Sequence, residues 1–421
     1  MKLIKLSFQN LLHKPLHLAL SLVLFALGVG LISLLFVLNK QITQKFESNL
    51  AGIDLIIGAK GSPLQLVLNG LYHLDAPTGN ISLLEARPFL NPKHPLIKKA
   101  VPLSLGDSYQ GFRIVGTTID FLELYNASIE SGALWTKPME VVIGHSIANT
   151  TSLKMGDKFI SSHGLTTDDI NQHDHAPFTV VGILKPTGSV CDQLVLTSTE
   201  SIWQVHEHQA EKKDTLHTDA GGHPEGDHDH DGEVDSATLA DRQITTLLIQ
   251  YKSRTNIQAL NLQRNINQNT QLQAATPAIE INRLFSLMGI GFDALRSLAW
   301  VIAFVSGLSI FISLYNSLKD RRHELALMRV MGATPKKLFA LIILEGLIIS
   351  ILGYLIGMFL AHTVLFLSAD RLFELYKYRF DAFTFIREEA WLLIGALAIG
   401  LVAAIIPAFQ AYKTEIAKNL H

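Results

Sequence analysis

Long apolar runs alternate with mixed polar segments along the chain, and these runs predict membrane-spanning helices. They cover residues 16–38, 298–318, 338–367 and 391–409. At about 1.5 Å per residue, each run can cross a hydrocarbon core of about 30 Å, and the third is long enough to tilt or to protrude. We therefore expect a multi-pass protein whose α-helical membrane domain has four spans.

The first run has to be distinguished from a signal peptide, because Lys2, Lys5 and Lys14 precede it. The run is longer than the core of about 7–15 residues that signal peptides have. Its exit at residues 36–40, with the sequence FVLNK, contains no small-x-small cleavage site. We therefore expect an uncleaved helix.

Basic residues near the spans predict the orientation, because Lys and Arg are enriched in cytoplasmic loops. The segment between the second and third runs contains Lys319, Arg321, Arg322, Arg329, Lys336 and Lys337. Both termini are also basic, so we expect the termini and this loop in the cytoplasm. The expected divisions are 1–38 (N-terminal helix and first span), 39–292 (extracytoplasmic domain), 293–318 (second span), 319–337 (cytoplasmic loop), 338–367 (third span), 368–390 (short extracytoplasmic loop) and 391–421 (fourth span and tail).

The extracytoplasmic segment alternates short strand-like runs with helical ones. Runs that end at Gly or Pro predict strands at 114–116, 141–144 and 178–184. A strand at 244–251, a helix at 256–267 and a strand near Leu272 predict a β-α-β unit. The predicted fold class is thus a four-span α-helical membrane domain plus an α+β extracytoplasmic domain of two lobes, joined to the membrane by helical stalks.

Composition agrees with a membrane protein and excludes other classes. Only 17% of residues are charged and 48% are hydrophobic, whereas a soluble domain has about a quarter charged residues. The formal net charge of −2 provides no basic field for nucleic acid. The single cysteine, Cys191, cannot form an internal disulfide.

Small residues form stripes at helical spacing on three of the spans. In lipid, helices associate where small side chains let their backbones approach closely, so the stripes predict packing faces, although Gly and Ala are also common in spans generally. The stripes are Ala19, Ala26, Gly30 and Ser33 in the first span; Gly346, Ser350, Gly353, Gly357 and Ala361 in the third; and Ala396, Gly400, Ala403, Pro407 and Ala411 in the fourth.

Glu345 is a carboxylate inside the third span. Intramembrane acids usually face other protein groups, because burying a charge in lipid is unfavourable. A proton relay would need a titratable partner at matching depth, and His362 lies about 25 Å further along the helix. We therefore expect Glu345 to make a polar contact between helices.

The loop at residues 321–337, with the sequence RRHELALMRVMGATPKK, contains a recognisable motif. It resembles the R-x-x-E-[IL]-x-x-[LM]-[RK]-x-[LM]-G-A-[TS] signature of MacB/FtsX/LolC-type ABC transporter permease subunits, the type VII superfamily. Glu345 and the glycines of the third span fit that family, as do the closing P-A-x-x-A at 407–411 and an amphipathic segment at 3–12 that would run along the membrane. Segments 142–157 and 54–63 are also similar to members of the family, so the resemblance covers nearly the whole chain except about 165–176 and 204–240.

The resemblance implies a non-catalytic transmembrane subunit that works with a separate ATPase chain, which binds the ATP. The 319–337 loop would form a helical element in a groove of that ATPase. Closure of the ATPase dimer would then move the spans and stalks as levers on the extracytoplasmic domain. The predicted coupling residues are Arg322, Glu324, Leu325, Met328, Arg329, Gly332, Ala333 and Thr334, with Leu327 and Met331 as further docking side chains, and the predicted span-packing residues are Glu345, Gly346, Gly353 and Gly357.

The same resemblance implies further partners and a location. The partners are a second permease copy, most simply in a homodimer, membrane lipid, and a periplasmic partner or substrate protein. The location is the bacterial inner membrane, with the large domain in the periplasm. The substrate would be a lipoprotein, lipid, peptide or drug.

Two glycine-containing segments imitate nucleotide-binding motifs without meeting their requirements. Residues 52–60 have the wrong spacing for a phosphate loop, and the lysine follows an alanine. Residues 289–294 follow a predicted helix rather than a strand, so they do not fit a dinucleotide fingerprint. We therefore expect no nucleotide site on this chain.

A segment rich in His, Asp, Glu and Gly lies at residues 204–240. Imidazole and carboxylate groups are ligands for Zn²⁺, and flexible i, i+2 pairs can chelate a metal without a preformed fold. The segment predicts either a solvated low-complexity insert or a weak, exchangeable zinc site, and a tight structural site is a third alternative. The candidate ligands are His206, His208, His217, His223, His228 and His230.

Three functions are compatible with these observations. The first is a force-transmitting permease that acts on a periplasmic or membrane-derived substrate. The second is an FtsX-like regulator whose outer domain activates a periplasmic partner. The third, which only the histidines suggest, is a permease of a zinc-linked system.

Overall fold

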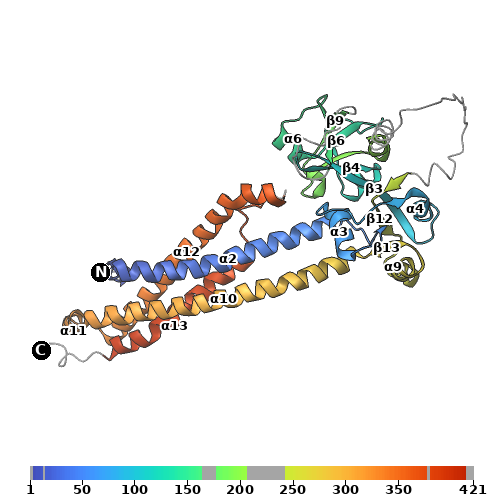
Figure 1. Cartoon of the computed structure of the whole chain (residues 1–421). Helices are drawn as coiled ribbons and strands as arrows, with labels where there is room; N and C mark the ends of the chain where they lie inside the picture. The colour runs from blue at the N-terminus through green and yellow to red at the C-terminus, as the bar shows by residue number, and fades with distance from the viewer. Residues whose placement is uncertain (1–2, 13–14, 164–176, 206–241, 377–379, 414–421) are drawn as a thin grey trace, which may run out of the picture. The chain divides into compact units, whose positions relative to one another are not determined.

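The computed structural model describes residues 3–12, 15–163, 177–205, 242–376 and 380–413 (Figure 1). The chain divides into two compact units. The helical unit consists of residues 1–43 and 287–421, and the α/β unit consists of residues 44–286. These boundaries lie close to residues 39 and 292, where the predicted extracytoplasmic domain begins and ends.

Within the described residues, four helices are long and apolar enough to cross a membrane. They contain the four predicted apolar runs, so the predicted spans are confirmed. Two shorter helices accompany them, one at the N-terminus and one between the second and third spans. The helices are α1 (Leu3–Leu12), α2 (Pro15–Asn49), α10 (Pro277–Asp320), α11 (Arg322–Val330), α12 (Pro335–Tyr376) and α13 (Arg387–Tyr412).

Glycines on α12 bring two other helices into backbone contact. A Cβ atom on Gly357 would lie 2.6 Å from the carbonyl oxygen of Ala26 on α2. A Cβ atom on Gly346 would lie 2.8 Å from the carbonyl oxygen of Gly400 on α13. Both distances are shorter than van der Waals contact, so only glycine fits at these positions of α12.

The predicted stripes need one correction. Ala19 is exposed, because the contact of α2 with α12 begins further along the helix. Gly353 of α12 lies against Phe25, whose ring would be 2.5 Å from a Cβ atom there. The stripe on α13 is buried throughout, at Ala396, Gly400, Ala403, Pro407 and Ala411.

The α/β unit is built on one mixed sheet with the order β13-β1-β12-β3-β4-β10-β6-β9-β5, from which β7 and β8 branch. Its strands are β1 (Leu55–Ala59), β3 (Ile97–Tyr109), β4 (Phe112–Thr117), β5 (Ile129–Gly132), β6 (Glu140–Ile143), β7 (Lys158–Phe159), β8 (Ser162–His163), β9 (Phe178–Leu184), β10 (Leu194–Ser198), β12 (Thr246–Tyr251) and β13 (Leu272–Ala275). A separate pair is formed by β2 (Ile81–Ser82) and β11 (Gln243–Ile244). The helices of this unit are α3 (Pro63–Tyr72), α4 (Leu83–Leu90), α5 (Asp120–Leu124), α6 (His145–Thr151) and α9 (Ile257–Asn269).

The long strand β3 joins the two predicted lobes. Its first half pairs with β12, from Ile97 opposite Tyr251 to Leu103 opposite Thr246. Its second half pairs with β4, from Ser104 to Tyr109. Helices α3 and α9 accompany the lobe that contains β1, β12 and β13, and α6 accompanies the other (Figure 1).

The predicted β-α-β unit is present in a split form. Strands β12 and β13 flank α9 in sequence, but each pairs with β1 and not with the other. Both pairings are antiparallel, so β1 is inserted between the two strands of the unit. The sequence pattern identified the elements but could not show that a strand from residues 55–59 separates them.

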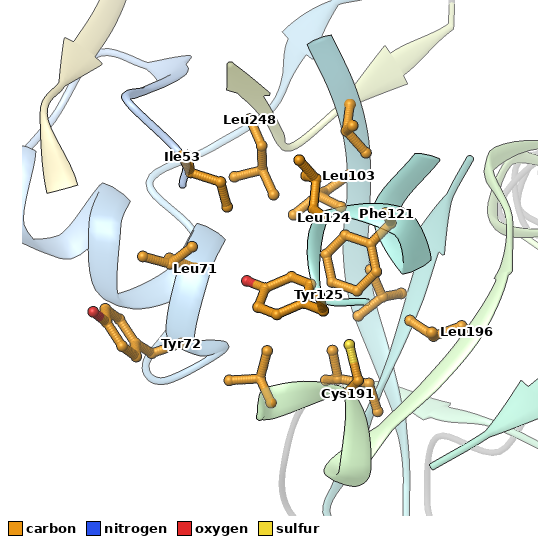
Figure 2. Packing of buried hydrophobic residues seen from close by; sticks show 14 of the residues in the cluster. Ile53, Leu71, Tyr72, Leu103, Phe121, Leu124, Tyr125, Cys191, Leu196 and Leu248 are labelled. Carbon is orange, nitrogen blue, oxygen red and sulfur yellow. The ribbon is translucent and has the colours of Figure 1, made fainter. Parts of the chain in front are cut away.

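One buried core extends through both lobes (Figure 2). Leu71 and Leu248 come from the β1 lobe, whereas Phe121 and Leu196 come from the β4 lobe. The ring of Tyr125 lies between these groups, 5.0 Å from that of Phe121. Because the lobes share a core, the α/β unit is a single packed body.

The ends of α2 and α10 are part of this packed body. The ring of Phe46 in α2 lies 4.6 Å from that of Tyr72 and 5.5 Å from that of Phe285 in α10. The Oδ1 atom of Asn49 accepts a hydrogen bond of 2.9 Å from the backbone N–H of Val190. The last turn of α2 and the first turns of α10 are therefore fixed to the α/β unit by ring packing and hydrogen bonds.

Candidate functional site

Helix α11 packs one face on the long helices of the helical unit. Leu325 and Ala326 are 1% and 0% exposed. Leu325 lies in an apolar cluster with side chains from α10, α12 and α13, namely Leu318, Leu338, Leu341, Ile342, Ala408 and Ala411. This face holds α11 against the helical unit.

The other face of α11 presents apolar side chains at the surface. Leu327, Val330 and Met331 are 43%, 59% and 78% exposed. Their i, i+3, i+4 spacing places them together on one side of the helix and its end. We call these three residues the exposed α11 face. Contiguous exposed apolar groups of this kind mark a contact site.

This arrangement corrects one predicted docking residue and adds another. Leu325 is buried against α10 and α12, so it fixes α11 in place and is not available to a partner. Val330 was not predicted, although its spacing from Leu327 was a usable signal. Met328 is partly buried against the same cluster as Leu325.

The charged residues predicted for coupling lie in different environments. Arg322 is exposed and Arg329 is partly buried. The side chain of Glu324 is 54% exposed, although it pairs with Arg321.

Gly332, Ala333 and Thr334 form the turn between α11 and α12. Gly332 has φ +95°, a conformation that strains residues with a side chain. Its N–H donates to the carbonyl of Arg329 at 3.1 Å, and the N–H of Ala333 donates to that of Met328 at 2.9 Å. These two bonds make the Schellman ending of a helix, and Pro335 then begins α12. In this structure, Gly332 and Ala333 thus reverse the chain direction.

A buried polar group, the Arg321 cluster, joins α11 to α12 and α1. It consists of Asn10, Arg321, Glu324 and Glu345. The Arg321 guanidinium donates to Glu324 at 3.1 Å and to Glu345 at 3.4 Å, and the Asn10 amide donates to Glu345 at 2.9 Å. Glu345 is 1% exposed, and it makes the expected polar contact between helices.

Sequence reasoning selected Arg322 in this region, but the buried arginine is its neighbour Arg321. Arg321 is the turn residue between α10 and α11, and Arg322 is the first residue of α11, so packing around the turn decides which side chain faces inward. The Nη2 atom of Arg321 and the Oε2 atom of Glu345 have no hydrogen-bond partner among the described residues. The cluster is therefore held by three hydrogen bonds and by charge attraction between Arg321 and the two carboxylates.

A second buried polar group, the His362 cluster, lies elsewhere in the helical unit. It consists of Ser33, His362, Ala382 and Glu389. The Ser33 hydroxyl donates to Oε1 of Glu389 at 2.7 Å, and the Nε2 atom of His362 lies 3.2 Å from the same oxygen. The Nδ1 atom of His362 lies 2.6 Å from the carbonyl oxygen of Ala382. No sequence pattern indicated this cluster, because His362 and Glu389 lie on different helices.

The α/β unit contains a buried histidine of another kind. His73 ends α3 with φ 55° and is 7% exposed. Neither ring nitrogen has a hydrogen-bond partner among the described residues. Burial lowers the pKa of His73 to about 3, and the nearby Arg113 guanidinium adds to the effect. His73 is therefore a neutral core residue at neutral pH.

The two segments that imitate nucleotide motifs have structural roles. The Lys60 ammonium donates to the carbonyls of Asn267 and Thr270 at 3.0 and 2.9 Å, so it binds the C-terminal end of α9. Residues 289–294 lie inside the continuous helix α10. Residues 289–294 therefore form no loop before a helix, whereas residues 60–62 lead from β1 into α3.

The six predicted zinc ligands, His206 to His230, lie outside the described residues. Among the residues that the structure does describe, no group of three or more His, Cys, Asp or Glu side chains could hold a metal ion. Zinc binding by the insert therefore remains a prediction.

Two family models match this chain. A family model described as the FtsX-like permease C-terminal region matches residues 296–416. A model described as the MacB-like periplasmic core domain matches residues 18–264, which is more than half of the chain. A solved structure of the periplasmic region of MacB from Actinobacillus actinomycetemcomitans is similar, with 11% identity and a TM-score of 0.32, over 57% of this chain and 98% of that one. The search of curated proteins found no match.

Proposed function

Since this chain belongs to the MacB/FtsX family of ABC transporter permeases, we propose that it couples ATP hydrolysis by a separate ATPase subunit to movement of its periplasmic α/β unit. In such a complex the chain would be a non-catalytic membrane subunit. Its substrate would be periplasmic or derived from the membrane, such as a lipoprotein, a lipid, a peptide or a drug.

The exposed α11 face is the observation that carries this proposal. Leu327, Val330 and Met331 present apolar surface beside the charged side chain of Glu324, on a helix that is itself anchored by Leu325. A rigid helix with an apolar centre and charged flanks is suited to the groove of a partner protein. In the orientation that the basic residues predict, this face would lie in the cytoplasm, where the ATPase binds ATP.

A path for force from α11 follows from the contacts described above. The Arg321 cluster and the Leu325 packing would make α11 move together with α12. The glycine contacts of α12 would pass that movement to α2 and α13. Helices α2 and α10 then continue without a break into the segments that are packed in the α/β unit.

The location and the further partners of the proposed complex are inferred from the family. The chain would lie in the bacterial inner membrane with both termini in the cytoplasm. A second copy of the permease and a periplasmic partner or substrate protein would complete the assembly.

The proposal is tested by purifying the tagged full-length chain in lipid nanodiscs together with its bound proteins. We expect an ATPase subunit to co-purify, and its identity is read by mass spectrometry. Val330→Glu should weaken its binding by about 30-fold, the effect of a residue worth about 2 kcal/mol at an interface. A matched control is Ile257→Glu on α9, where an apolar side chain that is more exposed than Val330 lies on the α/β unit.

The control should retain the ATPase, and its ATP turnover should equal that of the unsubstituted complex. The proposal is wrong if no ATPase co-purifies with the unsubstituted chain. It is also wrong in its choice of surface if Val330→Glu and Met331→Glu both bind the ATPase as well as the control does.

A further inference from the structure

The His362 cluster connects three helices and a loop. Glu389 lies in the first turn of α13 and is 2% exposed. Its side chain contacts Ser33 on α2 and His362 on α12. Through its other ring nitrogen, His362 contacts the loop residue Ala382, which is itself 5% exposed. The cluster is therefore the point at which α2, α12, α13 and the loop at 380–386 are held together.

Hydrogen-bond chemistry fixes how many protons the cluster contains. The carbonyl oxygen of Ala382 can only accept, so the Nδ1 atom of His362 carries a proton. The Nε2 atom and Oε1 of Glu389 are 3.2 Å apart, and two lone pairs at this distance would repel each other. One more proton must therefore lie between them, either on the imidazole or on the carboxyl group.

We propose that His362 and Glu389 form a proton-dependent latch, which fixes the loop at 380–386 and the first turn of α13 to α12 and α2. With the shared proton present, all three contacts of the His362 cluster are satisfied. When that proton leaves to water, the Nε2 lone pair faces a carboxylate, and the ring can no longer bridge Ala382 and Glu389. The latch is thus closed at lower pH and opens as pH rises.

Other charged and titratable groups lie around the cluster. Asp381 interacts electrostatically with His362, and hydrogen bonds from Thr384 and from the backbone N–H of Phe383 lower its pKa, so it stays ionised. The hydroxyl of Tyr354 donates to the backbone carbonyl of Glu389 at 3.1 Å and not to its carboxyl group. Lys40 pairs with Glu388 at 3.6 Å on the exposed side of the helix.

Opening of the latch would weaken the contacts that hold α2. The side chain of Gln41 on α2 makes reciprocal hydrogen bonds of 2.7 and 2.9 Å with the backbone of Asp381. Ser33, also on α2, donates to Glu389. A loop and a first helical turn that are free of His362 would therefore hold α2 less firmly. This inference concerns the helical unit alone and does not depend on an ATPase partner.

The latch is tested by the reactivity of a cysteine at its buried loop residue. Ala382→Cys is placed in the full-length chain in nanodiscs and labelled with N-ethylmaleimide at about pH 5.5 and about pH 8.5, on either side of the ordinary histidine range. Its rate is divided by that of the exposed reference Lys93→Cys, which removes the intrinsic pH dependence of thiol reactivity. The chain without added cysteine gives the background, because Cys191 is buried and burial raises its pKa to about 12.

The expected result is a relative labelling rate at least tenfold higher at the higher pH, since one linked proton can change the open population by about tenfold per pH unit. Glu389→Gln separates this latch from a general loosening of the loop. Its amide donates to the neutral Nε2 atom without an extra proton, so labelling should stay slow at both pH values. His362→Ala should give fast labelling at both.

Two results would overturn the proposal. The first is a labelling rate of Ala382→Cys, relative to Lys93→Cys and with His362 and Glu389 unchanged, that does not change with pH. The second is a pH dependence that persists in Glu389→Gln, which would place the titrating group elsewhere. If His362→Ala fails to fold, the proposal is still tested by comparing the pH dependence of labelling in Ala382→Cys with and without Glu389→Gln.

Discussion

The helical unit contains two buried carboxylates in similar surroundings but with different partners. Glu345 is 1% exposed and Glu389 is 2% exposed. Glu345 faces the guanidinium of Arg321 and the amide of Asn10. Glu389 faces the imidazole of His362 and the hydroxyl of Ser33. Each carboxylate joins helices that are distant in sequence.

The two carboxylates differ in whether the basic side chain beside them, Arg321 or His362, can lose a proton. An arginine guanidinium does not lose its proton in a protein, so the charge that Arg321 contributes does not depend on pH. An imidazole can gain or lose a proton near neutral pH. The comparison therefore distinguishes a junction beside α11 whose cation is permanent from a junction whose cationic partner can lose its proton.

The two junctions also lie beside different backbone contacts of α12. Near Glu345, Gly346 of α12 meets Gly400 of α13. Further along, Gly357 of α12 meets Ala26 and Gly30 of α2. One helix thus packs tightly on α13 in its first part and on α2 in its second part.

Removal of the permanent charge pair should have the largest effect. Arg321→Met leaves Glu345 buried without its cation, which should destabilise the helical unit by about 3–5 kcal/mol. The measurement is thermal unfolding of the full chain in detergent. Arg321→Met combined with Glu345→Met is the matched control, and it should recover most of the stability because no unpaired charge remains. A single variant as stable as the double variant would show that the pair does not hold α11 to α12.

Crowding of the backbone contacts should have the next largest effect. Gly357→Val places a side chain against the carbonyl of Ala26, and we expect a loss of about 1–3 kcal/mol from overpacking. Gly395→Val is the control, because nothing lies within 4 Å of a Cβ atom there. Equal unfolding temperatures for the two variants would mean that α2 and α12 do not pack through this glycine.

The turn beside the Arg321 cluster should be less sensitive. Gly332→Ala forces an L residue into φ +95°, at about 1–2 kcal/mol. Gly332→Asn should lose less, because asparagine tolerates the left-handed region. Both are measured by the same unfolding experiment, and a larger loss for Asn than for Ala would point to a packing role that the open space around Gly332 does not indicate.

The smallest expected effect concerns His73, a histidine that lacks the acceptors of His362. Its folded pKa of about 3 lies below the unfolded value of 6.5, so the unfolded state binds more protons and stability falls as pH drops below about 6.5. At about pH 5.5 this amounts to about 1.4 kcal/mol relative to neutral pH. His73→Asn keeps a residue that tolerates φ 55° but removes the titrating ring.

Hydrogen exchange of peptides from β1 and β12 in the full chain measures this effect locally. The variant and the unsubstituted chain are compared at the same pH, so intrinsic exchange rates cancel. The protection of the unsubstituted chain should fall below that of His73→Asn at acidic pH. An identical acid response in both chains would mean that His73 is not the group responsible.

Sequence patterns were most reliable where one local rule acts over many residues. The four spans followed from unbroken apolar length, and α9 and β12 followed from their periodicity. Strand β3 was missed because Lys98, Lys99 and Pro102 interrupt its apolar pattern. Proline and charged residues normally argue against a central strand, and the half of β3 that contains them pairs with β12 on one side only.

The candidate site was only partly predictable for a related reason. The motif at 321–337 located α11 and its glycine turn. It did not show that Leu325 is buried or that Val330 is exposed, because both are apolar residues of one short helix. The directions of such side chains depend on where α11 lies relative to α10, α12 and α13.

Apolar length, small-residue spacing and a local motif are properties of neighbouring residues, so the four spans, the helical connection at 319–337 and the family resemblance could be predicted from the sequence. Only the packed structure shows that Arg321, and not Arg322, contacts Glu345, and that His362 contacts Glu389. A buried charge or ring nitrogen is satisfied by whichever group the packing of distant helices brings within hydrogen-bond distance.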